Sequence, residues 1–362
     1  MKFSIKVLTS AFLAVTTPLI LAGSALAASF SYGSTAIQEI EYLSANLAGR
    51  SIGTAKEQEA IAYLSGRLSD FGYTPTLQSF DFTRGGIDYT SANIIAERTG
   101  SSGRQIIVGA HYDTAPSSRT IDRTNLEGVN DNSSGVGVLL ELAERISMTN
   151  PRHTVKFILF GAEEVGLRGS RYYANNMTPE EIESTIVMIN MDSLIFGDHM
   201  YFNAGRNAAN RSRYGRYRDI ALDIAAELGI DARTNPGLNP DYPAGTGCCS
   251  DLEAFDSIVP VLAAEATNWS IGDLDGYTQT ADPRVPGGAT WHDPTTDNRE
   301  FINEIFPGLI EERSRNYTAV FDTFLGRLNS GAISVPEPGS VIGIVLAVGL
   351  GGLATRKKSS NP

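Results

Sequence analysis

The chain has 362 residues, of which 41 are acidic and 29 basic, and its two cysteines are sequence neighbours. So acidic a chain is unsuited to binding nucleic acid, which requires clustered Lys and Arg. Two adjacent cysteines cannot join distant segments as a disulfide framework, and a chain of this length can bury a large core without one.

The first 27 residues are predicted to be a secretory signal peptide. Lys2 and Lys6 precede an apolar run from Val7 to Leu21, and small residues at Ala25 and Ala27 complete the pattern that a signal peptidase reads. We therefore expect cleavage after residue 27 and a mature domain that begins at residue 28.

Residues 28–334 are predicted to form one α/β domain. Apolar residues recur at helical spacing in some segments, and short apolar or β-branched runs indicate strands in others. The predicted strands are 76–82, 92–97, 105–110, 154–160, 185–191 and 259–264, and the predicted helices are 60–71, 133–148, 167–175, 213–228 and 298–328, the last broken at Pro307. This alternation favours a three-layer α/β sandwich with a mixed, mostly parallel central sheet, which binds ligands beyond the carboxyl ends of its strands.

Three polar motifs come directly after predicted strands. His111 follows the third strand, and Asp113, two residues on, is suited to hold the second ring nitrogen of a ligating histidine. Glu163 and Glu164 leave the fourth strand between glycines, where adjacent carboxylates are costly unless a cation or a substrate uses them. Asp192 ends the fifth strand in the same manner.

Two further residues complete a candidate metal site. Asp131 lies in the polar run 130–134, where a helix cap needs only one such residue, and a carboxylate there can bridge two cations. His292 lies in the last loop, whereas His153 and His199 have no such context and are expected on the surface. Two histidines with several carboxylates suit Zn²⁺-type ions, and paired metals about 3.5–4 Å apart suit amide hydrolysis.

The adjacent Cys248 and Cys249 leave two interpretations open. They are either two free thiols or a vicinal disulfide. A metal site is disfavoured, because its paired cysteines are normally separated by two or more residues.

The order of these motifs resembles a known family. His-x-Asp, Asn-Asp-Asn-x-Ser-Gly, Gly-Ala-Glu-Glu-x-Gly-Leu-x-Gly-Ser, Asn-Met-Asp and a late His are similar to the co-catalytic zinc aminopeptidases of the aminopeptidase Y and bacterial leucyl aminopeptidase type. The resemblance covers about residues 34–328. Within the family, segments 248–251, 265–269 and 275–277 resemble the isozyme-conversion branch, which is associated with removal of an N-terminal Arg.

The resemblance implies two zinc ions and peptide or protein N-termini as substrates. Glu163 would be the general base, taking a proton from the attacking water and passing it to the leaving amine, while Asp113 would orient His111. His111 and Asp192 would hold one zinc ion, and Glu164 and His292 would hold the other. Asp131 would bridge the two ions.

Two positions depart from the family pattern. Many relatives have Tyr directly before the last His, where this chain has Trp291, whose indole either donates to the oxyanion or only packs. The Ser-Asp-His segment of relatives is Ser250-Asp251-Leu252 here. An acidic cluster near the expected pocket suggests a preference for basic first residues, although a solvated acidic loop would look the same; its members are Asp251, Glu253, Asp256, Asp273 and Asp275.

Three other functions remain open. A glutaminyl cyclase-like enzyme would use one zinc ion and release no amino acid. A carboxypeptidase would need a basic pocket for the terminal carboxylate of its substrate. A catalytically inert cell-surface module would keep only the fold, but the intact Glu163–Glu164 pair and five ligand positions argue against it, because unused buried carboxylates are costly.

Residues 335–362 resemble a PEP-CTERM sorting signal. Pro336-Glu337-Pro338 is followed by an apolar stretch, 341–354, and by the basic run 356–358, and the stretch is short for a stable anchor of about 20 residues. The resemblance implies exosortase processing, only transient membrane contact, and a protein in the periplasm, on the cell surface or outside the cell. Removing both ends leaves 24 basic and 40 acidic residues, a net charge of −16, which would tolerate metal cations and attract basic substrates.

Overall fold

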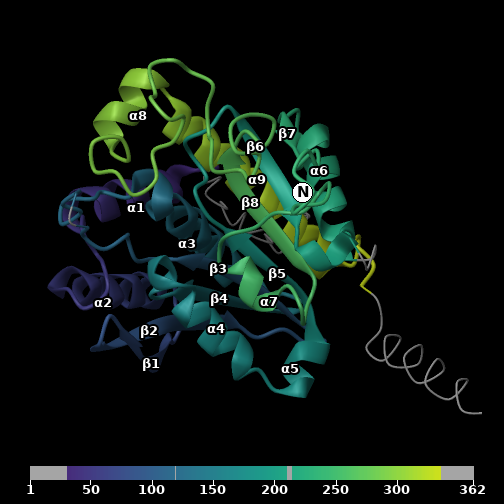
Figure 1. Ribbon diagram of the computed structural model, residues 1–362. Coiled ribbons are helices and arrows are strands. Elements are labelled where there is room, and N and C mark those ends of the chain that lie inside the picture. The colour runs from purple at the N-terminus through teal and green to yellow at the C-terminus, as the bar shows by residue number, and fades with distance from the viewer. Residues whose placement is uncertain (1–30, 119, 210–213, 336–362) are drawn as a thin grey trace, which may run out of the picture. The chain divides into compact units, whose positions relative to one another are not determined.

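The computed structural model describes residues 31–118, 120–209 and 214–335, and these residues contain one eight-stranded mixed sheet (Figure 1). The predicted signal peptide and residues 336–362 of the predicted sorting signal lie outside the described residues. The strands lie in the order β1 (Thr76–Arg84), β2 (Ile87–Arg98), β4 (Thr154–Phe160), β3 (Gln105–His111), β5 (Thr185–Met191), β8 (Val261–Thr267), β6 (His199–Ala204) and β7 (Ala232–Arg233).

The centre of the sheet is parallel. Strands β4, β3, β5 and β8 pair in parallel, while β2 pairs antiparallel with β1 and β4, and β6 pairs antiparallel with β8. Every residue of β3 and β5 is buried, as the continuous apolar runs predict for strands covered on both faces. The carboxyl ends of the four parallel strands therefore meet at one edge of the sheet.

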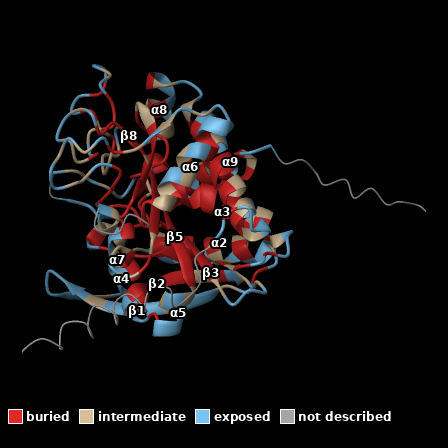
Figure 2. Cartoon of the chain, turned by 90° about the vertical axis from the view of Figure 1, so that its right-hand side faces the viewer, coloured by how far each residue is buried: buried red, intermediate tan, exposed pale blue. Residues whose placement is uncertain are grey.

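Helices cover both faces of the sheet. One face carries α1 (Ser34–Asn46), α2 (Ala55–Asp70), α3 (Ser134–Ser147), α6 (Arg216–Glu227) and α9 (Leu309–Ser330). The other carries α4 (Arg168–Asn175), α5 (Pro179–Ser184) and α7 (Leu252–Phe255). Alternate residues of β3 enter the two cores, Ile106 and Val108 on the first face and Ile107 on the second. Figure 2 shows the buried strands enclosed by helices whose outer surfaces are exposed.

Each predicted strand and helix is present. Helices α1, α5 and α7 and strands β6 and β7 were not predicted, because their segments carry no long apolar run. The predicted last helix is divided around Pro307, as expected, into α8 (Arg299–Ile305) and α9. In the part of the chain described, no helix combines the length and the apolar character needed to cross a bilayer.

The expectation that His153 lies on the surface was wrong. Its side chain is buried, and its Nδ1 lies 2.7 Å from Ser102 Oγ. Asn329 of α9 accepts a hydrogen bond from the His153 backbone, so the end of the domain covers a residue that precedes a strand. His199 is half-buried as the first residue of β6.

Candidate metal centre

The seven candidate site residues gather beyond the carboxyl ends of the parallel strands. His111 is the last residue of β3, and Asp192 directly follows β5. Glu163 and Glu164 form the turn η2 (Glu163–Val165) after β4. The other three lie in loops at the same edge: Asp113 after β3, Asp131 in the turn η1 (Val129–Ser133) before α3, and His292 in the loop before α8.

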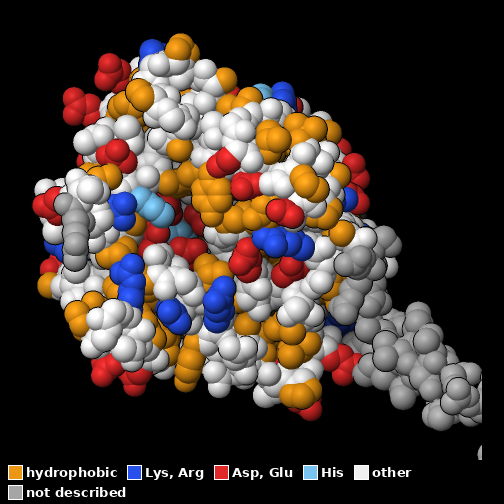
Figure 3. All heavy atoms as spheres, viewed as in Figure 1, with side chains coloured by type: hydrophobic (Ala, Val, Ile, Leu, Met, Phe, Trp, Pro, Cys, Tyr) orange, Lys and Arg blue, Asp and Glu red, His pale blue; other side chains and the backbone are white. Residues whose placement is uncertain are grey.

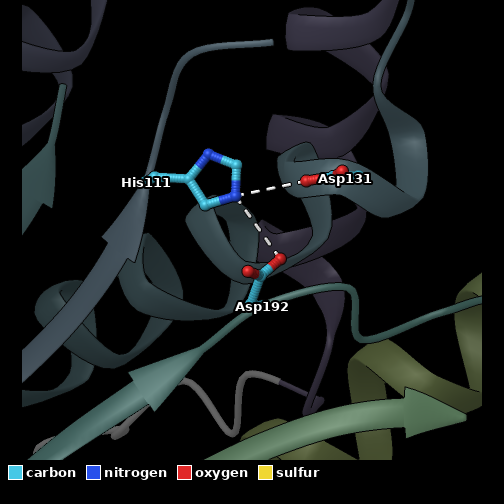
Figure 4. Close-up of side chains that lie close together, drawn as sticks. All are labelled: His111, Asp131 and Asp192. Atoms are coloured by element: carbon cyan, nitrogen blue, oxygen red, sulfur yellow. Dashed lines mark ion pairs between the residues drawn. The ribbon is translucent and has the colours of Figure 1, made fainter. Parts of the chain in front are cut away.

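Five of these side chains form two groups that share one member. His111 Nε2 lies 3.2 Å from Asp131 Oδ1 and 3.4 Å from Asp192 Oδ1, as Figure 4 shows. His292 Nε2 lies 3.2 Å from Asp131 Oδ2 and 2.8 Å from Glu164 Oε2. In each group the ligand atoms lie within 4.8 Å of one another. Asp131 thus presents one carboxylate oxygen to each group.

The chemistry of these side chains fits divalent cations. His111 Nε2 and Glu164 Oε1 are buried, and neither has a hydrogen-bond partner among the described residues. Burial alone would lower the pKa of His292, but the carboxylates of Asp131 and Glu164 raise that pKa to about 11. The centre therefore stabilises positive charge at the imidazole, and its mixture of nitrogen and oxygen donors suits zinc.

The polar run 130–134 fixes Asp131, the residue that the two groups share. Asn130 Oδ1 accepts hydrogen bonds from the backbone amides of Ile195 and Phe196, at 3.0 and 2.8 Å. Asn132 Nδ2 donates to the Met191 carbonyl at 3.0 Å, at the end of β5. These bonds tie the turn that carries Asp131 to the segment that carries Asp192, so the run does more than cap a helix.

Asp297, which the sequence analysis did not identify, supports the same turn. Its fully buried carboxylate accepts the backbone N–H groups of Asn130 at 2.7 Å and Asp131 at 3.1 Å. Burial and the charge of Asp131 raise the pKa of Asp297 to about 8. No motif surrounds Asp297 in the sequence beyond its place just before the cap of α8, so only the tertiary structure reveals this contact.

Arg50 is a second support that lies far from the motifs in sequence. It is fully buried, and its guanidinium donates to the carbonyls of Tyr112, Glu127 and Gly128 and to Ser133 Oγ, at 2.7 to 3.2 Å. One side chain therefore joins the segment after β3 to both ends of the turn that carries Asp131.

Replacing Arg50 by Lys is expected to lower the free energy of unfolding by about 2–4 kcal/mol, because an ammonium group cannot reach all four acceptors and leaves buried carbonyls unpaired. Chemical denaturation measures this loss. The matched control is Arg327→Lys on the surface, whose pair with Glu227 is exposed and whose unfolding midpoint should not move. Equal midpoints for the two variants would show that Arg50 does not hold this turn.

Asp113 holds the two adjacent glutamates. Its Oδ1 accepts the Glu163 N–H at 3.0 Å, and its Oδ2 accepts the Glu164 N–H at 3.3 Å. His111 Nδ1 donates a hydrogen bond to the backbone carbonyl of Asp113 at 3.1 Å, while the carboxylate Oδ1 of Asp113 lies 3.7 Å from the same nitrogen. Asp113 therefore fixes both the histidine and the glutamate turn.

Glu163, the first residue of the turn η2, lines the cleft without belonging to either ligand group. Burial raises its pKa well above the ordinary value, and the carboxylates of Glu164, Asp251 and Asp192 add to this effect against the charge of His111. Bound cations would oppose that shift. Glu163 is thus a carboxylate beside the centre that belongs to neither candidate ligand group.

Three residues at the centre have unusual backbone conformations. Ala162, Ser193 and His292 have φ of 57°, 54° and 58°, in the left-handed region that residues with a Cβ seldom adopt. Each is either a candidate ligand or the neighbour of a candidate site residue. Such conformations persist where the surrounding structure imposes them, which is common at functional sites.

A cleft of about 520 Å³ opens over the centre. Figure 3 shows a hollow in this face in which histidine and acidic side chains are visible. Trp291 lines the cleft, but its indole N–H donates to Ser193 Oγ at 2.7 Å, and the ring of Tyr277 packs edge-on against it. Cys248 and Cys249 form a disulfide in the cleft wall, which decides between the two interpretations of that pair.

The sequence pattern of peptidase family M28 matches residues 93–305, which include every candidate site residue. The chain belongs to peptidase family M28. As an M28 peptidase it is a hydrolase acting on peptide bonds, as the sequence analysis predicted. The alkaline phosphatase isozyme conversion protein of Escherichia coli (strain K12) is 37% identical over 301 residues, which cover 78% of this chain and 87% of that relative.

Solved structures share the fold of this M28 peptidase. The zinc aminopeptidase BSAP from Bacillus subtilis superposes with a TM-score of 0.61 at 17% identity, covering 80% of this chain and 94% of that chain. A glutaminyl cyclase from Porphyromonas gingivalis gives a TM-score of 0.62 at 19% identity, covering 83% and 100%. At such identities the likeness concerns the fold alone, and the predicted α/β sandwich is confirmed.

Proposed function

We propose that this M28 peptidase is a two-zinc aminopeptidase that removes the first residue of peptides or proteins. The observation that carries the proposal is the shared carboxylate of Asp131, which faces His111 and Asp192 with one side and Glu164 and His292 with the other. A single ion would leave one of the two groups without a cation among buried carboxylates, which is costly.

The residues divide the chemistry between them. Zinc ions, when bound, supply Lewis-acid polarisation of the scissile carbonyl and of water. Glu163 takes a proton from the water that attacks the carbonyl carbon, and delivers it to the amine nitrogen as the C–N bond breaks. The indole N–H of Trp291 already donates to Ser193 Oγ. We therefore propose that the hydroxyl of Tyr277, which also lines the cleft, donates to the oxyanion that forms when water attacks the carbonyl.

The charge of the cleft favours the amino end of a substrate. Beyond the candidate ligands and Glu163, the described lining of the cleft includes Glu253, Glu265 and Asp275, and its one basic residue that is not a candidate ligand is Arg171. A carboxypeptidase would need the opposite balance. The same acidity favours substrates with a basic first residue.

We propose that the enzyme is exported. Support comes from the sequence patterns at both ends, which predict processing by signal peptidase and by an exosortase, with the membrane contacted only through residues 341–354. The excess of acidic over basic residues does not favour nucleic acid as a partner. The final location would be the periplasm, the cell surface or the medium.

A pair of peptides with free and acetylated N-termini tests the exopeptidase activity. We expect release of the first residue from the free peptide and at least about 1000-fold slower cleavage of the acetylated one, because acetylation removes the charged amine that the acidic cleft accommodates. Mass spectrometry of the products measures both rates. Cleavage of the acetylated peptide, or loss of residues from the carboxyl end, would exclude an aminopeptidase. Cyclisation of an N-terminal Gln without any release would favour a glutaminyl cyclase.

A further inference from the structure

Glu265 of β8 lines the cleft as a carboxylate held in one orientation. Its Oε1 accepts hydrogen bonds from Trp269 Nε1 at 2.7 Å and from Asn203 Nδ2 at 2.8 Å. Asn203 is itself fixed, since its Oδ1 accepts from Thr234 Oγ1 and from the backbone N–H of Asn235. Three separate segments therefore aim one carboxylate at the cleft, while none of the described residues hydrogen-bonds to Glu265 Oε2.

Among the described residues, no Lys or Arg compensates the charge of Glu265 with an ion pair. Burial raises the pKa of Glu265 to about 7, with a further contribution from Asp192. A half-buried carboxylate with an unused oxygen gains most from a cationic hydrogen-bond donor. The cleft supplies the path by which such a donor can arrive from solvent.

Four of the five members of the acidic cluster within 251–275 already have partners within the protein. Glu253 faces Arg206 at 3.5 Å, and Asp256 accepts the backbone N–H groups of residues 206 and 207. Asp275 accepts from the side chain of Asn239, and Asp273 accepts the Asp275 N–H. These carboxylates organise loops. Asp251, the fifth, is fully buried beside the glutamate turn.

The wall around Glu265 suits a long side chain with a charged end. The Cys248–Cys249 disulfide and Gly276 line the cleft, and Cys248 packs with Trp269 and Tyr201. A Cβ at Gly276 would lie 2.7 Å from the Trp269 ring, so the glycine lets the loop close against the indole. An apolar wall with a carboxylate beside it matches the methylene stem and cationic head of Arg or Lys.

We propose that Glu265 selects substrates with a basic first residue, its Oε2 accepting a hydrogen bond from the guanidinium or ammonium group of that side chain. This role rests on the proposed aminopeptidase function, because the same cleft contains the candidate metal ligands. Arg forms the stronger pair, since its planar fork matches a carboxylate.

Comparison of Arg and citrulline anilides, which differ in charge but hardly in shape, tests the proposal with the full-length chain. We expect the wild type to prefer Arg in kcat/KM and Glu265→Gln to lower the Arg-to-citrulline ratio about 10- to 100-fold. Gln can still accept from Trp269 and Asn203, so the fold should persist. The matched control Glu227→Gln removes a carboxylate that pairs with Arg327 on the surface outside the cleft, and it should change the ratio less than about threefold.

Calorimetric binding of free arginine and citrulline gives a second readout that needs no catalysis. The wild type should bind arginine more tightly, and Glu265→Gln should remove most of the difference. If Glu265→Gln leaves the Arg-to-citrulline ratio unchanged in both assays, the role of Glu265 is overturned. If the variant also weakens both ligands equally, Glu265 acts on the α-amine that they share. A wild type that binds arginine selectively but hydrolyses no anilide would refute the aminopeptidase function while leaving Glu265 supported.

Discussion

Replacing Glu163 by Gln is expected to lower kcat about 10³- to 10⁴-fold, because an amide cannot take a proton from water and return it to the leaving amine. The zinc content should stay unchanged, since Glu163 belongs to neither ligand group. The side chain keeps its shape, and its backbone N–H still donates to Asp113, so the turn should remain in place. Steady-state kinetics on an aminoacyl anilide and elemental analysis of the same preparation measure both properties.

The neighbouring glutamate provides the matched control. Glu164 Oε2 lies 2.8 Å from His292 Nε2, so Glu164→Gln should lose zinc together with activity. Both variants lie on one turn and remove one charge each, which makes the difference in metal content specific to the ligand. Glu163→Gln retaining more than about a tenth of the activity, or losing zinc as Glu164→Gln does, would contradict the assignment of Glu163 as the base.

The parts of the site that follow strand ends could be predicted from the sequence. The continuous apolar runs of β4 and β5 define strands whose bounds agree with the prediction, and parallel strands end at one edge of the sheet. His111, Glu164 and Asp192 come together for this reason. Their proximity can be predicted because each lies in a polar motif that directly follows an apolar strand.

Residues that act across long sequence distances could not be predicted in this way. Asp297 reaches Asp131 from 166 residues away, and Arg50 reaches Ser133 from 83 residues away, and neither sits in a recognisable motif. Glu265 illustrates the same limit. Segment 265–269 belongs to the pattern that resembles the isozyme-conversion branch, but the orientation of the Glu265 carboxylate depends on Asn203 of β6, a strand that the sequence did not predict.

Removing zinc with a chelator is expected to lower peptide hydrolysis at least about 1000-fold and to lower the melting temperature. The catalytic loss follows because no group of the chain can replace the Lewis acid. The stability loss follows because Asp131, Glu164 and Asp192 would then face one another without cations. A chelator treatment followed by dialysis, with activity and thermal unfolding measured on the same sample, checks both effects.

The most direct test of the two-metal account is to titrate the metal-free enzyme with zinc while following release of the first residue from a peptide. Activity should rise until about two equivalents are bound per chain, because the groups that meet at Asp131 each hold one ion. Full activity at one equivalent, or zinc binding without any release of amino acid, would contradict the account.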